Sequence, residues 1–418
     1  MRQGILFNIL SLILLVSLFL FTPFDGFKKL VILGTLTLVW MISSFAINRK
    51  AMGQTISLII MLFFLLILQW IYSGFPGEED QFRRFFTQNI WTYIWGVLGV
   101  FYASNINIFR KSIPFIVAMI TVSSIYTLIG NIAIPGASRM LAGSAIEGSQ
   151  TYSIIHSMNI GGYGFIYALV FAVVPCTLWI KYRLDKIVIS VLFLALILST
   201  LLVGSYFTSI ILAVVALVLS LSNTKKISTS VIVSSLLILL VIVFSNTILQ
   251  RLVDFGALID SPMLQTRAQQ MIDGTYQEAY ESAGDYSRWD RIVNAVHNIR
   301  QSPIFGRMTS RHLDILPSGH SELLGYFERF GVFGLMHILY FYTIYKKIVK
   351  CAFTKEMRLL ITVFFSLFFF FIALDTFDIA NSTGCMVFFI APCTMLYIES
   401  KAYSYKAEGN NLKKPFYA

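Results

Sequence analysis

Apolar runs long enough to cross a lipid bilayer recur along the whole chain, and this recurrence limits the protein to a helical membrane fold. A helix needs about 20 mainly apolar residues to span the hydrocarbon core, where it satisfies its own backbone polar groups. Charged residues make up 13% of the 418-residue chain, about half of the roughly 25% that is usual in soluble proteins. We therefore predict an all-α integral membrane protein with about 12 transmembrane helices. The expected spans are residues 4–22, 27–47, 51–73, 90–104, 113–134, 160–180, 187–203, 207–222, 229–249, 328–345, 358–374 and 382–399.

The basic residues divide unevenly between the two sides of such a bundle. With the N-terminus in the cytoplasm, the inner segments hold 19 of the 32 basic residues and 4 of the 21 acidic ones, a charge of +15. The outer segments hold the other 13 basic and 17 acidic residues, a charge of −4, and the two sides sum to the net charge of +11. Because basic loops stay cytoplasmic, we predict that both termini are cytoplasmic. The positive charge is then a topology signal, so we expect the lipid bilayer as a partner and no nucleic acid.

Three outer segments are long enough to carry chemistry, about 74–89, 135–159 and 250–320. We divide the chain into an N-terminal transmembrane bundle of about nine spans (1–249), an extracytoplasmic catalytic loop (250–320), and C-terminal transmembrane helices with a basic cytoplasmic tail (321–418). Of the 13 outer basic residues 11 are arginine, whose planar fork binds phosphate bidentately. The inner side has no nucleotide-binding motif, so we expect any reaction to take place on the outer face.

In the long outer loop, residues 287–306 (SRWDRIVNAVHNIRQSPIFG) predict an amphipathic helix and its end. Apolar side chains recur at helical spacing on one face, and Pro303 and Gly306 end the helix. Arg288 and Arg291 lie beside this face at the N-terminal end, where free backbone N–H groups favour an anion. Lying on the bilayer with its apolar face down, the helix would present both arginines to a lipid-linked phosphate. The alternative is a surface helix whose arginines pair with acidic residues.

The next segment, HSELLGYFERFGVFG (320–334), leads into a span, and we expect one continuous helix from His320 to Tyr345. Its 26 residues would measure about 39 Å against a hydrocarbon core of about 30 Å, so His320 and Glu322 would stand at the outer interface. Imidazole has an unperturbed pKa of about 6.5 and can accept a proton from a hydroxyl, which makes His320 a candidate general base. The alternative is an interfacial histidine with no chemical role. His337 would lie about 25 Å further along this helix, and we expect it to pack against a neighbouring helix by a hydrogen bond.

These elements together resemble the O-antigen polymerase and ligase superfamily, which includes the Wzy-type oligosaccharide repeat-unit polymerases. The shared pattern is an arginine-containing helix that ends in sPxxG, followed by H-S-x-x-L and G-x-x-G at the entry to a span. The segment SRMLAG (138–143), after the fifth span, resembles the family's arginine-containing first outer loop. The chain departs from the pattern where Gly306 is followed by Arg307 in place of a G-x-G. The residues that carry the resemblance are Ser287, Arg288, Arg291, Ser302, Pro303, Gly306, His320, Ser321, Leu324, Gly331 and Gly334.

The resemblance implies a metal-independent, GT-C-like glycosyltransferase of the bacterial cytoplasmic membrane that needs no cofactor. It would polymerise oligosaccharide repeat units linked to undecaprenyl pyrophosphate into surface polysaccharide (O-antigen, capsule or exopolysaccharide) on the outer leaflet. His320 would be the catalytic base, Arg139, Arg288 and Arg291 would hold the pyrophosphate, and Glu322 would contact substrate. A flippase and a chain-length regulator would be protein partners. Two alternatives stay open: ligase-type transfer to another acceptor, and a polysaccharide or lipid transporter, which predicts inverted repeats.

The charge division predicts which parts of the chain an impermeant reagent reaches. Ser282→Cys, in the long outer loop, should react with a membrane-impermeant maleimide on intact cells, whereas Lys406→Cys, in the basic tail, should react only after the cells are opened. The parent chain, with its four native cysteines, gives the background on a gel of the purified protein. Labelling of Lys406→Cys but not of Ser282→Cys on intact cells would overturn the topology.

Overall fold

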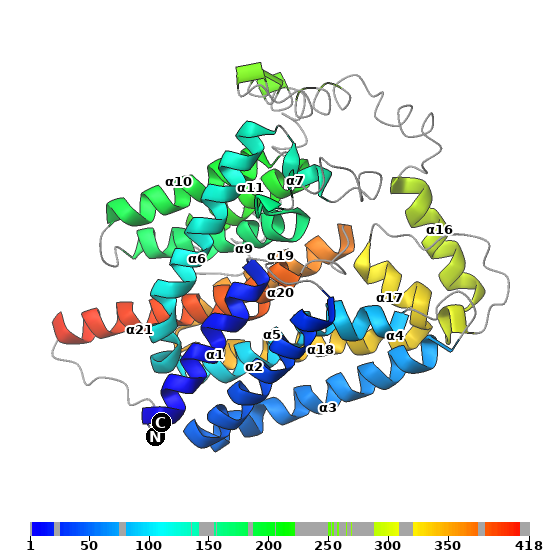
Figure 1. Ribbon diagram of the computed structural model, residues 1–418, viewed down its shortest axis with the longest axis horizontal. Helices are drawn as coiled ribbons and strands as arrows, with labels where there is room; N and C mark the ends of the chain where they lie inside the picture. Colours follow the sequence, from blue (N-terminus) through cyan, green and yellow to red (C-terminus); the bar gives the residue numbers. More distant parts are fainter. Residues whose placement is uncertain are drawn as a thin grey trace.

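The computed structural model is helical throughout its regular structure. It describes residues 2–20, 26–74, 81–134, 136–141, 154–155, 157–182, 187–204, 206–221, 288–308, 321–374 and 381–409, with a few single positions between 250 and 269. Within these residues, two π-helical turns, η1 (Phe85–Asn89) and η5 (Met386–Ile390), and two 3₁₀ turns, η3 (Gly306–Met308) and η4 (Gly331–Gly334), join or interrupt the α-helices. The α-helices (Figure 1) are α1 (Arg2–Leu20), α2 (Gly26–Ile47), α3 (Arg49–Tyr72), α4 (Gln81–Arg84), α5 (Ile90–Ala103), α6 (Ile106–Ala133), α7 (Ala137–Met140), α9 (Tyr163–Lys181), α10 (Ile187–Val203), α11 (Phe207–Leu221), α16 (Arg288–Gln301), α17 (Glu322–Phe330), α18 (Leu335–Cys351), α19 (Lys355–Leu374), α20 (Asn381–Cys385) and α21 (Ala391–Gly409).

Within the described part of the chain, six helical segments are long and apolar enough to cross a membrane. They are α1, α3, α6, α9, most of α19, and the segment Ser382–Ser404 that contains η5. The predicted class, an all-α multi-pass membrane protein, is therefore confirmed. Each expected span overlaps a described helix except 229–249, which lies outside the described residues, and the expected span 328–345 is divided between the end of α17 and α18. Separate helices α10 and α11 on either side of Gly204 confirm that the short apolar runs there are two elements.

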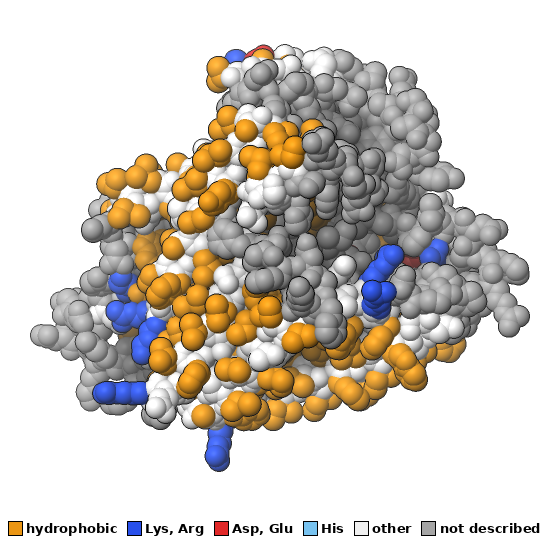
Figure 2. Space-filling model, in the orientation of Figure 1, with side chains coloured by type: hydrophobic (Ala, Val, Ile, Leu, Met, Phe, Trp, Pro, Cys, Tyr) orange, Lys and Arg blue, Asp and Glu red, His pale blue; other side chains and the backbone are white. Residues whose placement is uncertain are grey.

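Apolar side chains cover the outside of the bundle as well as its core. On α3, Ile60, Phe63 and Trp70 are each more than half exposed, whereas Leu58 and Leu65 on the opposite face are completely buried. Figure 2 shows hydrophobic side chains spread over the visible face of the bundle. An apolar surface of this extent is not typical of a protein in water. It is the surface that faces lipid.

The short turns between helices meet at one end of the bundle. Asn48, between α2 and α3, donates from its side chain to Oδ1 of Asn105, between α5 and α6, at 2.8 Å. The Ser104 hydroxyl contacts Sγ of Cys351 at 3.8 Å, and the Glu399 carboxylate accepts two backbone N–H bonds from the turn before α19, at 3.1 and 2.6 Å. All of these turns belong to segments that the charge division assigns to the cytoplasmic side. The grouping agrees with that assignment, and which side this end faces stays a prediction.

The short helix α5 lies at the centre of the bundle, and every residue of it except Ile94 is buried. Gly96 and Gly99 allow this close packing, because a Cβ at Gly96 would collide with Ile344 of α18 and one at Gly99 with the carbonyl of Phe388 in η5. Helices without side chains at the contact approach closely, which is how glycine commonly serves in membrane bundles. The tight packing of α5 therefore holds the residues at its N-terminal end in place.

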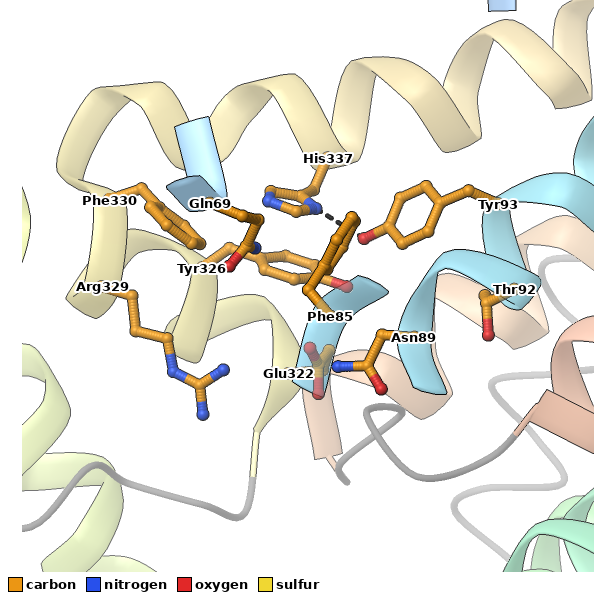
Figure 3. A pocket seen from close by; sticks show the side chains of 10 residues that line it. All are labelled: Gln69, Phe85, Asn89, Thr92, Tyr93, Glu322, Tyr326, Arg329, Phe330 and His337. Atoms are coloured by element: carbon orange, nitrogen blue, oxygen red, sulfur yellow. Dashed lines mark hydrogen bonds between the residues drawn. The ribbon is translucent and has the colours of Figure 1, made fainter. Parts of the chain in front are cut away.

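The expected continuous helix over 320–345 is wrong, because the chain reverses direction at Gly331. This residue has φ +56° and ψ −136°, a backbone conformation that residues with a side chain rarely adopt. The rings of Tyr326 and His337 stack with centroids 4.2 Å apart, although eleven residues of straight helix would separate them by about 16 Å. Helix α17 therefore folds back along the first turns of α18 (Figure 3).

Gly306, at φ +57°, packs directly against this reversal. A Cβ on Gly306 would lie 2.5 Å from the carbonyl oxygen of Arg329 and 2.6 Å from the backbone nitrogen of Gly331. The backbone N–H of Val332 donates to the carbonyl of Ile304 at 3.1 Å. The glycines of the sPxxG and G-x-x-G patterns thus meet, backbone against backbone, and they fix α16 to the joint between α17 and α18.

We expect Gly331→Ala to destabilise the folded protein by at least about 1–2 kcal/mol, because a side chain is strained in this conformation and its Cβ would strike the backbone of Ile304. Gly325, in the middle of α17, has nothing within 4 Å of an added Cβ. Gly325→Ala is therefore the control and should be neutral or stabilising by up to about 1 kcal/mol. Thermal unfolding of the detergent-solubilised variants, followed by tryptophan fluorescence, measures both effects. Equal midpoints would contradict the reversal.

Candidate functional site

A pocket opens where α3, α5, α17 and α18 meet (Figure 3). Its residues lie at the ends of α3, α5 and α18 that are opposite the linked turns. Its empty volume is about 400 Å³, including the part open to solvent. The pocket lies at the end that the charge division assigns to the outside. Its lining residues are Gln69 from α3, Phe85 and Asn89 from η1, Thr92 and Tyr93 from α5, Glu322, Tyr326, Arg329 and Phe330 from α17, and His337 from α18.

His337 forms the base of this pocket, where it links α17 to α5. It is completely buried, with Nδ1 2.5 Å from the hydroxyl of Tyr93. Its ring stacks on that of Tyr326 and lies 5.4 Å from that of Phe330. Within the described part of the chain its Nε2 has no hydrogen-bond partner. The expected hydrogen bond to a neighbouring helix is confirmed, but the expected separation of His337 from the segment after His320 is wrong, because α17 folds back onto it.

Glu322 is the first residue of α17 and lines the pocket. Ser321 caps the helix, with its hydroxyl accepting from the backbone N–H of Leu324 at 3.3 Å. A carboxylate in the first turn is also favoured by the partial positive charge at a helix N-terminus. Glu322 is 7% exposed, so it is a buried residue of the pocket and not the exposed interfacial carboxylate that a continuous helix predicts.

The predicted amphipathic helix over 287–306 is present as α16, but it turns a different face inward. Ala295 and Asn298 are buried, whereas Val293 and Val296 are exposed. The side-chain amide of Asn298 donates to the carboxylate of Glu328, itself buried on α17, at 2.6 Å. Asn298 therefore holds α16 on the side of α17 that faces away from the pocket. The apolar stripe that was expected to lie on the bilayer is divided between this contact and the surface.

The other predicted site residues are only partly located. His320 lies outside the described residues. Arg288 and Arg291 lie in the first turn of α16 and Arg139 lies in α7, but the side chains of all three are outside the described residues. Helix α7 is fixed at the end of α6 by two hydrogen bonds between Ser138 and one buried amide side chain, at 2.7 and 3.0 Å. Helix α16 thus packs against α17, the helix that begins with Glu322. Helix α7 packs separately, against the end of α6.

Several pocket residues were not predicted from the sequence, among them Gln69, Asn89, Tyr93 and Arg329. They come from helices far apart in the chain, and apolar periodicity does not show which helix ends converge. Two signals were available. The outer segment 74–89 had been singled out by its length, and it ends at Asn89. Arg329 stands within the motif segment itself, seven residues after Glu322 and so on the same face of a helix.

The pocket combines an apolar wall with groups that hydrogen-bond in both directions. The ring of Tyr326 contributes the wall, while the amides of Gln69 and Asn89 both donate and accept. Glu322 accepts hydrogen bonds, and the guanidinium of Arg329 can bind an anionic group bidentately. In small-molecule sites, converging polar groups of this kind fix the orientation of the ligand. This mixture suits a ligand that carries hydroxyl groups next to a negative charge.

Comparison of the chain with protein-family models, with curated proteins and with solved structures finds no match. The functional argument therefore rests on the residues of the chain and on their arrangement.

We expect Tyr93→Phe to destabilise the protein by about 1–3 kcal/mol, because the buried Nδ1 of His337 loses its partner. Tyr126→Phe is the matched control, since Tyr126 is 52% exposed on α6 and its hydroxyl should contribute little. The two midpoints of thermal unfolding, each compared with that of the parent chain, measure the difference. If both variants unfold at the parent temperature, the bond between Tyr93 and His337 does not stabilise the site.

Proposed function

We propose that the protein is a membrane glycosyltransferase that polymerises oligosaccharide repeat units linked to undecaprenyl pyrophosphate, on the outer leaflet of the bacterial cytoplasmic membrane. One observation carries this proposal. Helix α17 begins directly after the His320–Ser321 pair, packs on one side against α16, which bears Arg288 and Arg291, and forms a wall of the pocket on its other side. Two motifs that are separated in the sequence, and that the resembling family shares, thus pack against each other, and one of them also lines the pocket. A GT-C-like architecture with twelve spans is part of the proposal.

In the proposed reaction the hydroxyl oxygen of the acceptor sugar attacks the anomeric carbon of the donor. A new carbon–oxygen bond forms as the bond from that carbon to the pyrophosphate oxygen breaks, and the electron pair of the broken bond leaves with the pyrophosphate. The hydroxyl proton passes to His320. A general base in position contributes about 10²–10⁴-fold to such a rate.

The leaving pyrophosphate gains negative charge, and the proposal assigns that charge to arginines. Arg288 and Arg291 stand at the start of α16, where backbone N–H groups and the helix dipole also favour an anion. Donors that are already oriented where charge develops are usually the largest contribution to such catalysis. Arg139 would add a contact from the first outer loop, and Arg329 would add one at the pocket, which Glu322 also lines.

The position of the pocket supports an enzyme over a transporter. Secondary transporters bind their substrates near the middle of the bilayer, between repeated halves. Here the pocket lies at one end of α5 and α18, and its residue from α18, His337, belongs to the first turn of that helix. This position suits a reaction at the membrane surface. Ligase-type transfer would use the same donor site and differs only in its acceptor.

We expect His320→Ala to abolish visible polymer in cells that lack the chromosomal copy, while the variant protein accumulates in the membrane normally. His297→Ala is the control, because His297 is exposed on α16 and its Nε2 lies 2.8 Å from Nε2 of Gln301 on the same helix. Surface polysaccharide on a gel, normalised to the membrane abundance of each variant, is the measurement. Normal polymer from His320→Ala would remove the assigned base.

The lipid-linked sugars that accumulate in His320→Ala cells separate the three functions. A polymerase defect leaves single repeat units on the outer leaflet, whereas a ligase defect leaves long glycans on the lipid carrier. A transport defect leaves single units on the inner leaflet. Either of the last two patterns contradicts the polymerase assignment.

A further inference from the structure

The turn after α16 and the turn before α18 form an exposed apolar tip, which we define as Ile304, Phe305, Val332 and Phe333. These four side chains are between 39 and 57% exposed. The rings of Phe305 and Phe333 lie 5.9 Å apart, so the two turns present one surface. An apolar cluster at the end of a molecule marks a contact with lipid or with another protein.

The backbone of the apolar tip is held in place on both sides. The N–H of Gly306 donates to the carbonyl of Ser302 at 2.9 Å, and the N–H of Val332 donates to the carbonyl of Ile304 at 3.1 Å. Gly306 and Gly331 pack together with no room for a side chain on either. The tip therefore has a defined shape, and its apolar side chains project because the backbone beneath them is fixed.

The apolar tip continues a surface of the bundle that faces lipid. Helix α18 begins directly after Gly334, and its Leu335, Leu339 and Tyr342 are 40, 52 and 48% exposed. These three positions recur at intervals of four and three residues, so they lie on one face of the helix. The segment from Gly331 to Leu335 contains no charged residue. An apolar surface thus runs without a charged break from α18 onto the tip.

Arginines bracket the part of the tip that follows α16. Arg300 is exposed in the last turn of α16, and Arg307 is half-buried directly after Gly306. An arginine side chain at a membrane interface places its apolar stem along acyl chains and its guanidinium among head-group phosphates. Arg300 is exposed and can make this contact beside the apolar tip, whereas Nε of Arg307 is buried.

We propose that the apolar tip inserts into the outer leaflet of the bilayer and that lipid acyl chains are its occupant. Helix α16 is then held along its length by α17 and at its C-terminal end by lipid. This differs from the arrangement expected from the sequence, in which the apolar stripe of the helix itself lies on the bilayer. The end of α16 that bears Arg288 and Arg291 is the end farther from the anchor. This inference does not depend on the reaction that the protein catalyses.

Photo-crosslinking to labelled lipid tests the proposal. p-Benzoylphenylalanine is placed at Phe305 or at Phe333, in the full-length chain reconstituted into vesicles that contain ³²P-labelled phosphatidylglycerol. The same residue at Leu339 is the reference for a lipid-facing position, and at His297 the reference for an exposed position on α16. We expect the ³²P adducts at Phe305 and Phe333 to match that at Leu339 and to exceed that at His297 several-fold. Mass spectrometry of the adducts should place the new bonds on acyl-chain carbons.

Two outcomes overturn the proposal. Adduct yields at Phe305 and Phe333 no higher than at His297 would show that the apolar tip does not enter lipid. Covalent dimers at these positions, in place of lipid adducts, would show that a second copy of the chain covers the tip. Each variant is scored only if its unfolding midpoint equals that of the parent chain. Because two positions are tested, the experiment still gives a result if one variant fails to fold.

Discussion

The reversal of the chain at Gly331 determines where the polar residues of the C-terminal half end up. A straight helix would separate Glu322 and Tyr326 from His337 by about 22 and 16 Å along its axis. With the reversal, both lie against residues of α5 and α18, and Tyr326 stacks on His337. The conformation at Gly331 is held by Gly306, so the end of α16 and the joint between α17 and α18 depend on each other. The pocket, the position of α16 and the apolar tip all follow from this one backbone contact.

Local signals in the sequence predict the helices well and their convergence poorly. Apolar runs and helix-breaking residues place α1–α3, α9 and α16 within a few residues, because span length and chain breaks depend on neighbouring residues only. The break before α18 is different. Gly331 looks like a glycine for helix packing, and its positive φ depends on Ile304 and Gly306, more than twenty residues earlier. Gln69 and Asn89 enter the pocket for a similar reason, since only the folded chain brings their helix ends together.

Several buried polar groups in the described part of this protein form pairs that join different helices. Asn298 and Glu328 connect α16 with α17, His337 and Tyr93 connect α18 with α5, and the hydroxyl of Tyr340 donates to the carbonyl of Tyr93 at 2.8 Å. A hydrogen bond inside an apolar environment is directional and costly to leave unmade. Such pairs orient helices that apolar packing alone would allow to slide. The segment that the sequence singled out for chemistry is thereby attached to the most buried helix of the bundle.

The last membrane-spanning segment carries a consequence for how the protein is made. It is 89% buried across its apolar window, and it contacts α5, α9 and α19. Its Glu399 supplies the acceptors for the backbone N–H groups before α19, which emerge from the ribosome some forty-five residues sooner. Until the C-terminal segment arrives, α5 has an uncovered side and α19 has an incomplete start. The helices made earlier therefore cannot complete their packing in the membrane until the final helix is synthesised. A chain that ends prematurely within that helix would be nearly full length and would still lack the contacts that cover α5 and complete the start of α19.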